Sequence, residues 1–184
     1  LAQVDAASLD PDPFAQFERW FAEARAAALA YPEAMALATA TADGRPSVRM
    51  VLLKGHDARG FAFYTNLGSR KGDELAANPH AALVFYWQPL DRQVRVEGTV
   101  ERVAGEEAQA YFDTRPHGSR IAAWASPQSR PVASRDELER LYAQAEKELA
   151  GAAGPRLPPH WGGYRVRPGA FEFWSKNASM RRSW

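Results

Sequence analysis

Five short strand-like segments follow one another between residues 34 and 103, and this succession most constrains the fold. Each segment is rich in β-branched, aromatic or alternating apolar residues, and turn-forming Gly, Asp, Asn or Pro residues separate them. The predicted strands are 34–41, 47–54, 61–65, 81–87 and 92–103. Short connections favour antiparallel pairing, because parallel strands need long crossovers. We therefore predict a mainly β fold, a small β-barrel decorated with helices.

Helical patterns flank and interrupt these strands. The pair Asp12-Pro13 predicts an N-cap and a first-turn proline for a helix that runs to about residue 30. Ser134, followed by Glu137, predicts a capping box at the start of another helix. Further helices are predicted at 69–77, 106–114 and 120–124, and two final strands at 161–166 and 170–174. We expect residues 1–12 to form a flexible arm and residues 13–184 a single domain.

The composition narrows the functional classes. The 184 residues carry a net charge of +1, which gives no global reason to bind nucleic acid or a membrane surface. The absence of cysteine excludes disulfides, thiolate nucleophiles and cysteine-held clusters, and it fits a reducing compartment such as the cytoplasm. The histidines do not pair at metal-ligand spacing, and there is no Walker A, nucleophile-elbow or dinucleotide-binding motif.

An apolar run closed at both ends by a cation, RMVLLK from Arg49 to Lys54, is the first candidate for binding. In a strand the two cations would lie roughly 16 Å apart and point to opposite faces. One phosphate cannot contact both of them. The segment therefore suggests an elongated anionic cofactor, or a cofactor beside an anionic substrate.

A second cation pair, Arg70-Lys71, follows Ser69 at a predicted helix start. Cations are mildly unfavourable in a first helical turn, so an anion in front of the helix would explain them. Two solvated surface cations are an equally simple interpretation of this pair alone. The preceding Arg49 and the pair Tyr64-Thr65 favour a phosphate.

Weaker candidates come from the second half of the chain. Tyr111 and Arg115 share a helix face, and with Ser119 and Lys54 they would form a second anion site. From spacing alone, a half-buried tyrosine, an exposed arginine and a loop serine are the simpler interpretation. Side chains that could hydrogen-bond or wall a flat heterocycle, or else be ordinary surface and core residues, are Gln93, Gln128, Ser129, Trp124, Trp161 and Trp174.

Read in order, these motifs resemble the pyridoxine/pyridoxamine 5′-phosphate oxidase family. The resemblance runs from about Asp12 to Trp174 and includes RMVLLK, FYTN, SRKG, RQVRVEG, WASPQS and PHWGGY. It implies an FMN-binding split β-barrel that acts as a homodimer with FMN at the subunit interface. The residues that it implies for FMN are Arg49, Met50, Val51, Leu52, Tyr64, Thr65, Arg70, Lys71, Gln93, Gln128, Ser129 and Trp174.

The resemblance also implies a substrate and a reaction. Lys54, Tyr111, Arg115 and Ser119 would hold the phosphate of pyridoxamine or pyridoxine 5′-phosphate. Loss of a hydride from the substrate to the flavin would lead to pyridoxal 5′-phosphate, and O2 would then reoxidise the flavin and give H2O2. No protein side chain is expected to act as nucleophile or base.

The sequence after Trp174 departs from the family pattern. There the family continues with Gln-Gly-Arg, two variable residues and Arg-Leu-His-Asp-Arg, whereas this chain reads SKNASMRRSW. The arginine and histidine that cover the substrate ring have no clear counterpart, and the family's final strand is expected to be missing. Two alternatives follow: a related flavin oxidase acting on a reduced phenazine-type compound, and a non-catalytic protein that binds flavin or pyridoxal phosphate.

Overall fold

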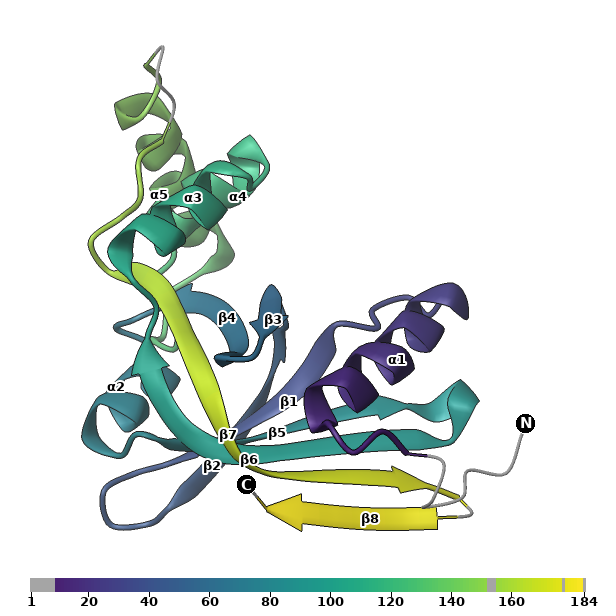
Figure 1. The fold of residues 1–184 in the computed structure, drawn as a ribbon. Helices are drawn as coiled ribbons and strands as arrows, with labels where there is room; N and C mark the ends of the chain where they lie inside the picture. Colours follow the sequence, from purple (N-terminus) through teal and green to yellow (C-terminus); the bar gives the residue numbers. More distant parts are fainter. Residues whose placement is uncertain (1–8, 152–154, 177, 184) are drawn as a thin grey trace.

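The computed structural model describes residues 9–151, 155–176 and 178–183. Its strands form one antiparallel sheet in the order β2-β1-β5-β6-β7-β4-β3, with β8 also pairing with β7 (Figure 1). The strands are β1 (Ala34–Ala40), β2 (Pro46–Leu52), β3 (Gly55–Asp57), β4 (Gly60–Asn66), β5 (His80–Trp87), β6 (Arg92–Arg102), β7 (Trp161–Ser175) and β8 (Ala178–Ser183). The helices are α1 (Pro13–Ala26), α2 (Arg70–Ala77), α3 (Gly105–Asp113), α4 (His117–Ala125), α5 (Arg135–Glu148) and the 3-10 turn η2 (Gln88–Leu90).

The long strand β7 produces the split in the barrel. One of its edges pairs with β6 along most of its length, while the other pairs first with β4 and then with β8. The register with β6 shifts at Gly98, which lies opposite Pro168. A proline lacks the N–H that a ladder needs, and a bulge accommodates it by bending the strand rather than ending it. The prediction of two separate final strands is therefore wrong, because they form one strand.

One further strand, which was not predicted, follows β7. Residues Ala178–Ser183 form β8, which pairs antiparallel with the second half of β7. Departure from the family's motif therefore does not prevent this segment from pairing, because a β ladder is made by backbone groups. The predicted split β-barrel is confirmed as the fold class.

The main core lies between the curled sheet and α1 (Figure 1). The Asp12 side chain accepts a hydrogen bond from the Phe14 N–H, which confirms the predicted N-cap. Phe17 is fully buried and meets Phe61 of β4 edge to face, with ring centroids 4.8 Å apart. The predicted flexible arm lies outside the described residues up to residue 8, and Leu9 is buried in this core.

A second, smaller hydrophobic cluster lies apart from the main core. It joins Phe112 of α3, Ala123 of α4 and Trp161 of β7. The helices α3, α4 and α5 gather at the end of the molecule away from α1 (Figure 1). The predicted capping box starts α5: Ser134 Oγ accepts from the Glu137 N–H, and Glu137 Oε2 accepts from the Ala133 N–H.

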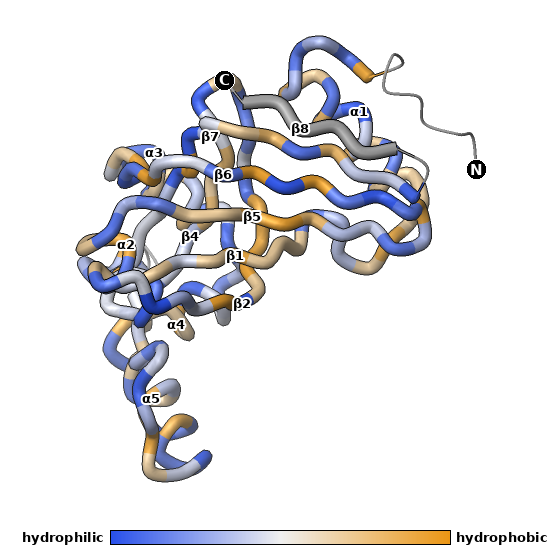
Figure 2. The backbone as a smooth tube through the Cα atoms, turned by 90° about the horizontal axis from the view of Figure 1, so that it is seen from below, coloured by the Kyte–Doolittle hydropathy of each residue, from blue (hydrophilic) through white to orange (hydrophobic). Residues whose placement is uncertain are grey.

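The outer face of the sheet carries exposed apolar residues near the edge strand β2. Val48 is 69% exposed and Met50 65%. Exposed and half-buried residues alternate along β2, which is the edge strand of the sheet, so its inward face is partly covered and its outer face is not. Figure 2 shows β7, β6, β5, β1 and β2 side by side. The exposed residues Leu52, Tyr86 and Trp174 belong to the same outer face.

Candidate functional site: a basic cluster and an aromatic shelf

Six side chains from four parts of the chain form what we call the basic cluster. It lies where the inward face of β2 and the end of β4 meet α2 and the loop after α4. Its members are Arg49, Thr65, Arg70, Lys71, Glu74 and Gln128.

Glu74 is the anionic centre of the basic cluster. The side chain is 4% exposed and accepts hydrogen bonds from Arg70 Nε at 2.8 Å and Arg49 Nη2 at 3.2 Å. The hydroxyls of Ser47 and Thr39 donate to the same carboxylate. Burial by itself raises the pKa of Glu74, but these hydrogen bonds outweigh it and lower the pKa to about 2. The carboxylate is therefore ionised and holds both arginines.

Lys71 lies beside this carboxylate network and is 7% exposed. Its Nζ donates to Gln128 Oε1 at 2.7 Å, to Thr65 Oγ1 at 3.0 Å and to Ser69 Oγ at 3.1 Å. Burial, with a smaller contribution from Arg49, lowers the pKa of Lys71 to about 8. Neutral oxygens surround the ammonium, so its charge has no carboxylate hydrogen-bonded to it among the described residues.

The charge balance of the basic cluster fits a phosphate. Arg49, Arg70 and Lys71 bring three positive charges, and Glu74 is the one carboxylate hydrogen-bonded to them in the described part of the chain. Arg70 is exposed, but Lys71 is buried and Arg49 is 20% exposed, and buried cations in excess are costly unless an anion compensates them. A phosphate monoester accepts the charge-assisted hydrogen bonds that such groups donate. The residues present therefore fit the phosphate end of a flavin mononucleotide.

The second group, which we call the aromatic shelf, consists of the rings of Tyr64, Tyr111 and Trp161. The rings of Tyr64 and Tyr111 stack with centroids 4.1 Å apart and an interplanar angle of 16°. The Trp161 ring is parallel to both within 8°, at centroid distances of 5.5 and 6.1 Å. Gly163 makes this possible, because a Cβ there would lie 2.7 Å from the Tyr64 ring.

Arg115 rests on the aromatic shelf. Its Cζ lies 4.7 Å from the Trp161 ring centroid and 5.6 Å from that of Phe112. Its Nη1 is buried and has no hydrogen-bond partner among the described residues. Burial lowers the pKa of Arg115, partly offset by Tyr111, yet a guanidinium remains charged at all physiological pH values. An unpartnered buried N–H on a cation is a ready site for an anionic oxygen.

The structure brings only part of the predicted substrate set together. Tyr111 and Arg115 lie side by side on the shelf, as predicted from their spacing. Lys54 follows β2 with an exposed side chain, and Ser119 is half-buried in the first turn of α4. Neither side chain hydrogen-bonds to Tyr111 or Arg115 within the described residues.

The predicted FMN residues divide between the two faces of the sheet. Arg49 pairs in register with buried Leu37 and so points inward. Gln93 and Trp174 are register partners on β6 and β7, and they alternate with inward-facing neighbours, so both point outward. Within one chain they do not join the basic cluster. Met50 and Leu52 also lie on the outer face, and Val51 lies inward.

Ser129 and Gln128 occupy the loop after α4. Ser129 has a left-handed backbone with φ of 66°, a conformation that non-glycine residues rarely adopt and that the surrounding structure must stabilise. This turn directs Gln128 toward Lys71. Gln128 was considered as a partner for a heterocycle, and in the structure it hydrogen-bonds within the basic cluster.

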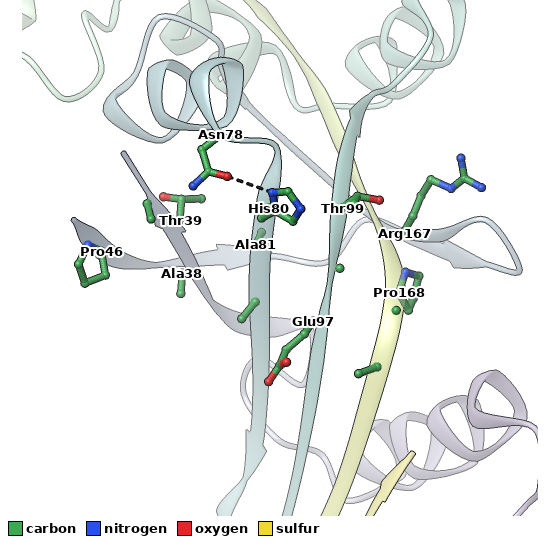
Figure 3. Close-up of a pocket in the computed structure, with 15 residues that line it drawn as sticks. Ala38, Thr39, Pro46, Asn78, His80, Ala81, Glu97, Thr99, Arg167 and Pro168 are labelled. Atoms are coloured by element: carbon green, nitrogen blue, oxygen red, sulfur yellow. Dashed lines mark hydrogen bonds between the residues drawn. The ribbon is translucent and has the colours of Figure 1, made fainter. Parts of the chain in front are cut away.

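A groove of about 750 Å³ lies elsewhere, on the outer face of the sheet (Figure 3). It is lined by residues of β1, β5, β6 and β7, including Ala38, Ala82 and Ala170, with Glu97 and Arg167 along it. None of the predicted site residues lines this groove. It shares the outer face with Val48, Met50 and Leu52.

Three side chains of the basic cluster region were missed by sequence reasoning: Thr39, Ser47 and Glu74. Glu74 follows Arg70 by four residues, and an i,i+4 pair of opposite charges was a signal that could have found it. Thr39 and Ser47 are register partners across the β1–β2 hairpin. Finding them required the strand register, which local sequence does not give.

Residues 9–151, 155–176 and 178–183 contain no group of three or more His, Cys, Asp or Glu side chains that could hold a metal ion. No helix in the same ranges combines the length and apolar character needed to cross a membrane.

Comparison with known proteins shows which family this chain resembles. Residues 21–147 match the family model described as pyridoxamine 5′-phosphate oxidase. The chain is 62% identical over 165 residues to the pyridoxine/pyridoxamine 5′-phosphate oxidase of Rubrobacter xylanophilus, covering 90% of this chain and 76% of that protein. It is 60% identical to the protein of the same name from Bordetella petrii, covering 91% and 78% of the two chains.

Solved structures show the same fold. PhzG from Burkholderia lata 383, in complex with tetrahydrophenazine-1-carboxylic acid, matches with a TM-score of 0.86 and 28% identity over 100% of this chain and 99% of that one. A pyridoxamine 5′-phosphate oxidase-related, FMN binding protein from Nostoc punctiforme matches with a TM-score of 0.72 and 17% identity, covering 94% and 91%. The family model and the sequence identities together show that this chain belongs to the pyridoxamine 5′-phosphate oxidase family.

Proposed function

We propose that this protein is an FMN-dependent oxidase that converts pyridoxamine or pyridoxine 5′-phosphate to pyridoxal 5′-phosphate, with O2 reduced to H2O2. The single observation that carries the proposal is the pairing of two separate cationic sites. The basic cluster has an excess of positive charge around Lys71, and the aromatic shelf has an unpartnered N–H on Arg115. A flavin phosphate and a substrate phosphate would require one site each.

The chain's own residues would bind and orient, and the flavin would supply the redox chemistry. The bound flavin would supply the redox chemistry by taking up a hydride equivalent that O2 would remove as H2O2, while water would replace the amino group of pyridoxamine 5′-phosphate, which leaves as ammonia. Arg49, Arg70 and Lys71 would hold the flavin phosphate, and Tyr64 of the aromatic shelf adjoins Thr65 of the basic cluster in β4. Tyr111 and Arg115 would fix the substrate phosphate, with Lys54 and Ser119 closing on it.

The proposal includes a homodimer with the flavin at the interface. Gln93 and Trp174 point to the outer face, whereas Arg49 points inward, so one chain cannot easily bring all three to one ligand. The exposed Val48 and Met50, on an edge strand of the same outer face, favour coverage by a second copy. The 750 Å³ groove opens on this face and would be covered with it. The cysteine-free sequence fits a cytoplasmic location.

The direct test uses flavin-loaded protein supplied with pyridoxamine 5′-phosphate and O2. We expect H2O2 and pyridoxal 5′-phosphate in equal amounts, together with a solution mass of two chains by light scattering. Full flavin occupancy without turnover would overturn the substrate assignment. A flavin-loaded monomer would overturn the interface.

The similarity to PhzG favours a second candidate. That structure holds tetrahydrophenazine-1-carboxylic acid and aligns with the whole of this chain. An oxidase acting on a reduced phenazine-type tricycle would use the same flavin site with a carboxylate near Arg115. Faster oxidation of such a tricycle than of the vitamin phosphate would select this candidate. Tight ligand binding with no O2 consumption for either compound would instead select a non-catalytic flavin- or pyridoxal-phosphate-binding protein.

A further inference from the structure

Trp161 stands at a junction that no assigned role explains. It is the first residue of β7, pairs in register with Asn66 at the end of β4, and is 7% exposed. Its ring belongs to the small cluster with Phe112 and Ala123 rather than to the main core under α1. Its neighbours on the shelf are the same residues that the proposed function places at the flavin and at the substrate phosphate.

The contact between Trp161 and Arg115 has a specific chemical consequence. The guanidinium Cζ lies over the indole face at 4.7 Å, which attracts the cation through the ring quadrupole. The indole ring offers the guanidinium no oxygen or nitrogen acceptor, so this contact leaves the N–H donors of Arg115 available to an anion. The buried and unpartnered Nη1 of Arg115 agrees with this arrangement.

The other face-to-face contacts extend the same platform. Trp161 is parallel to Tyr64 and to Tyr111 within 8°. The Tyr64 hydroxyl has no hydrogen-bond partner in the described part of the chain. Stacking on Tyr111 and Trp161 therefore sets the orientation of its ring. The Trp161 indole thus contacts both Tyr64, which is assigned to the flavin, and Arg115, which is assigned to the substrate phosphate.

We propose that Trp161 is a positioning residue that holds the Arg115 guanidinium against its indole face, so that the free N–H groups of Arg115 meet the substrate phosphate. This inference rests on the proposed function, because it takes Arg115 as the phosphate ligand. Trp161 acts through Arg115 and does not contact the reacting atoms. Its removal therefore weakens phosphate binding and leaves the flavin chemistry intact.

The test compares Trp161→Leu and Trp161→Phe in flavin-loaded protein, alone and combined with Arg115→Ala. We expect Trp161→Leu to raise KM for pyridoxamine 5′-phosphate about tenfold with kcat within twofold, from the usual strength of a desolvated cation–π contact. Trp161→Phe keeps an aromatic face and raises KM about threefold. In the Arg115→Ala background, Trp161→Leu adds less than twofold, because the residue it acts through is gone.

Trp124→Leu is the matched control, since its indole contacts His160 and the Arg156 carbonyl rather than Arg115. An equal rise in KM from Trp161→Leu in both backgrounds, or the same rise from Trp124→Leu, would overturn the inference in favour of a structural role. Should Trp161→Leu not fold, Trp161→Phe against Trp124→Phe carries the comparison, with about threefold expected for the first and no change for the second.

A binding measurement separates this inference from the proposed function. Calorimetric titration of the flavin-loaded protein with inorganic phosphate reports on Arg115 without turnover. If the wild-type protein does not oxidise pyridoxamine 5′-phosphate, the proposed function fails. Weaker phosphate binding in Trp161→Leu than in Trp124→Leu would still support the coupling to Arg115, and equal binding would overturn it.

Discussion

The basic cluster and the aromatic shelf hold arginines in opposite ways. In the basic cluster, Arg49 and Arg70 donate hydrogen bonds to the buried carboxylate of Glu74. On the shelf, Arg115 is held by a ring face, and its buried Nη1 has no partner among the described residues. An anion must therefore share donors with Glu74 at the first site, whereas it meets free donors at the second. Arginine side chains are therefore ion-paired within the protein in the basic cluster, whereas on the shelf an arginine keeps an N–H group free for a ligand.

This difference predicts where stability and where affinity reside. A cation satisfied within the protein contributes to the folded state, and its removal costs free energy of unfolding. A cation held only by an aromatic face contributes less to folding and more to the capture of a ligand. The predictions below test whether the two regions separate in this way.

The largest effect is expected from Glu74→Ala. This change leaves the Arg49 and Arg70 donors and two hydroxyls without their acceptor, and we expect a loss of about 3 kcal/mol in the free energy of unfolding. That corresponds to a Tm about 9 °C lower by calorimetry. Glu139→Ala is the control, since Glu139 also pairs with an arginine four residues away but is exposed. Equal Tm losses in the two variants would contradict a special role for the basic cluster.

Arg115→Ala should have the next largest effect, and on affinity rather than on stability. We expect KM for pyridoxamine 5′-phosphate to rise about 100-fold, because a buried charged donor to the phosphate is lost. The FMN dissociation constant, measured by flavin fluorescence, should change less than twofold. Arg135→Ala, at an arginine exposed on α5, controls for the lost charge. An equal loss of FMN affinity in Arg115→Ala would contradict the division into two separate binding sites.

The smallest effect is a pH dependence of FMN binding. The pKa of Lys71 is lowered to about 8 in the free protein, so its ammonium is lost as pH rises above that value. A phosphate monoester is fully ionised there, so FMN affinity should fall on the order of tenfold between pH 7 and pH 9. Riboflavin, which lacks the phosphate, should show no such fall. Lys71→Met should bind FMN weakly and without this pH dependence, and an unchanged profile in that variant would contradict the assignment.

The stability of the free protein should move in the opposite direction over this window. Between the pKa of about 8 in the folded state and the ordinary value of 10.5, the unfolded chain binds more protons at Lys71. The contribution of Lys71 to the free energy of unfolding therefore rises as the pH increases from about 8 to 10.5. In the wild type, stability should rise with pH while FMN affinity falls, and both pH dependences should be absent in Lys71→Met. This result would support a contact between the Lys71 ammonium and the FMN phosphate.

Much of the architecture could be predicted because its signals are local. The cap of α1 by Asp12, the capping box of α5 and the strand succession from residue 34 to 103 all depend on neighbours within a few positions. β7 is an exception. Two strands were predicted, at 161–166 and 170–174, but the segment between them, which contains Pro168, also pairs with β6 through a register shift.

Residue types and their spacing along the chain were enough to predict the family, most of the strands and the cations of both regions. Tertiary structure alone decided that Glu74 meets Arg49, 25 residues away, that Gln128 meets Lys71, 57 residues away, and that Arg115 lies on Trp161. It also placed Gln93 and Trp174 on the face opposite Arg49. The reason is that local preferences fix the period of each strand and helix, whereas the register and order of the sheet decide which distant side chains share a face.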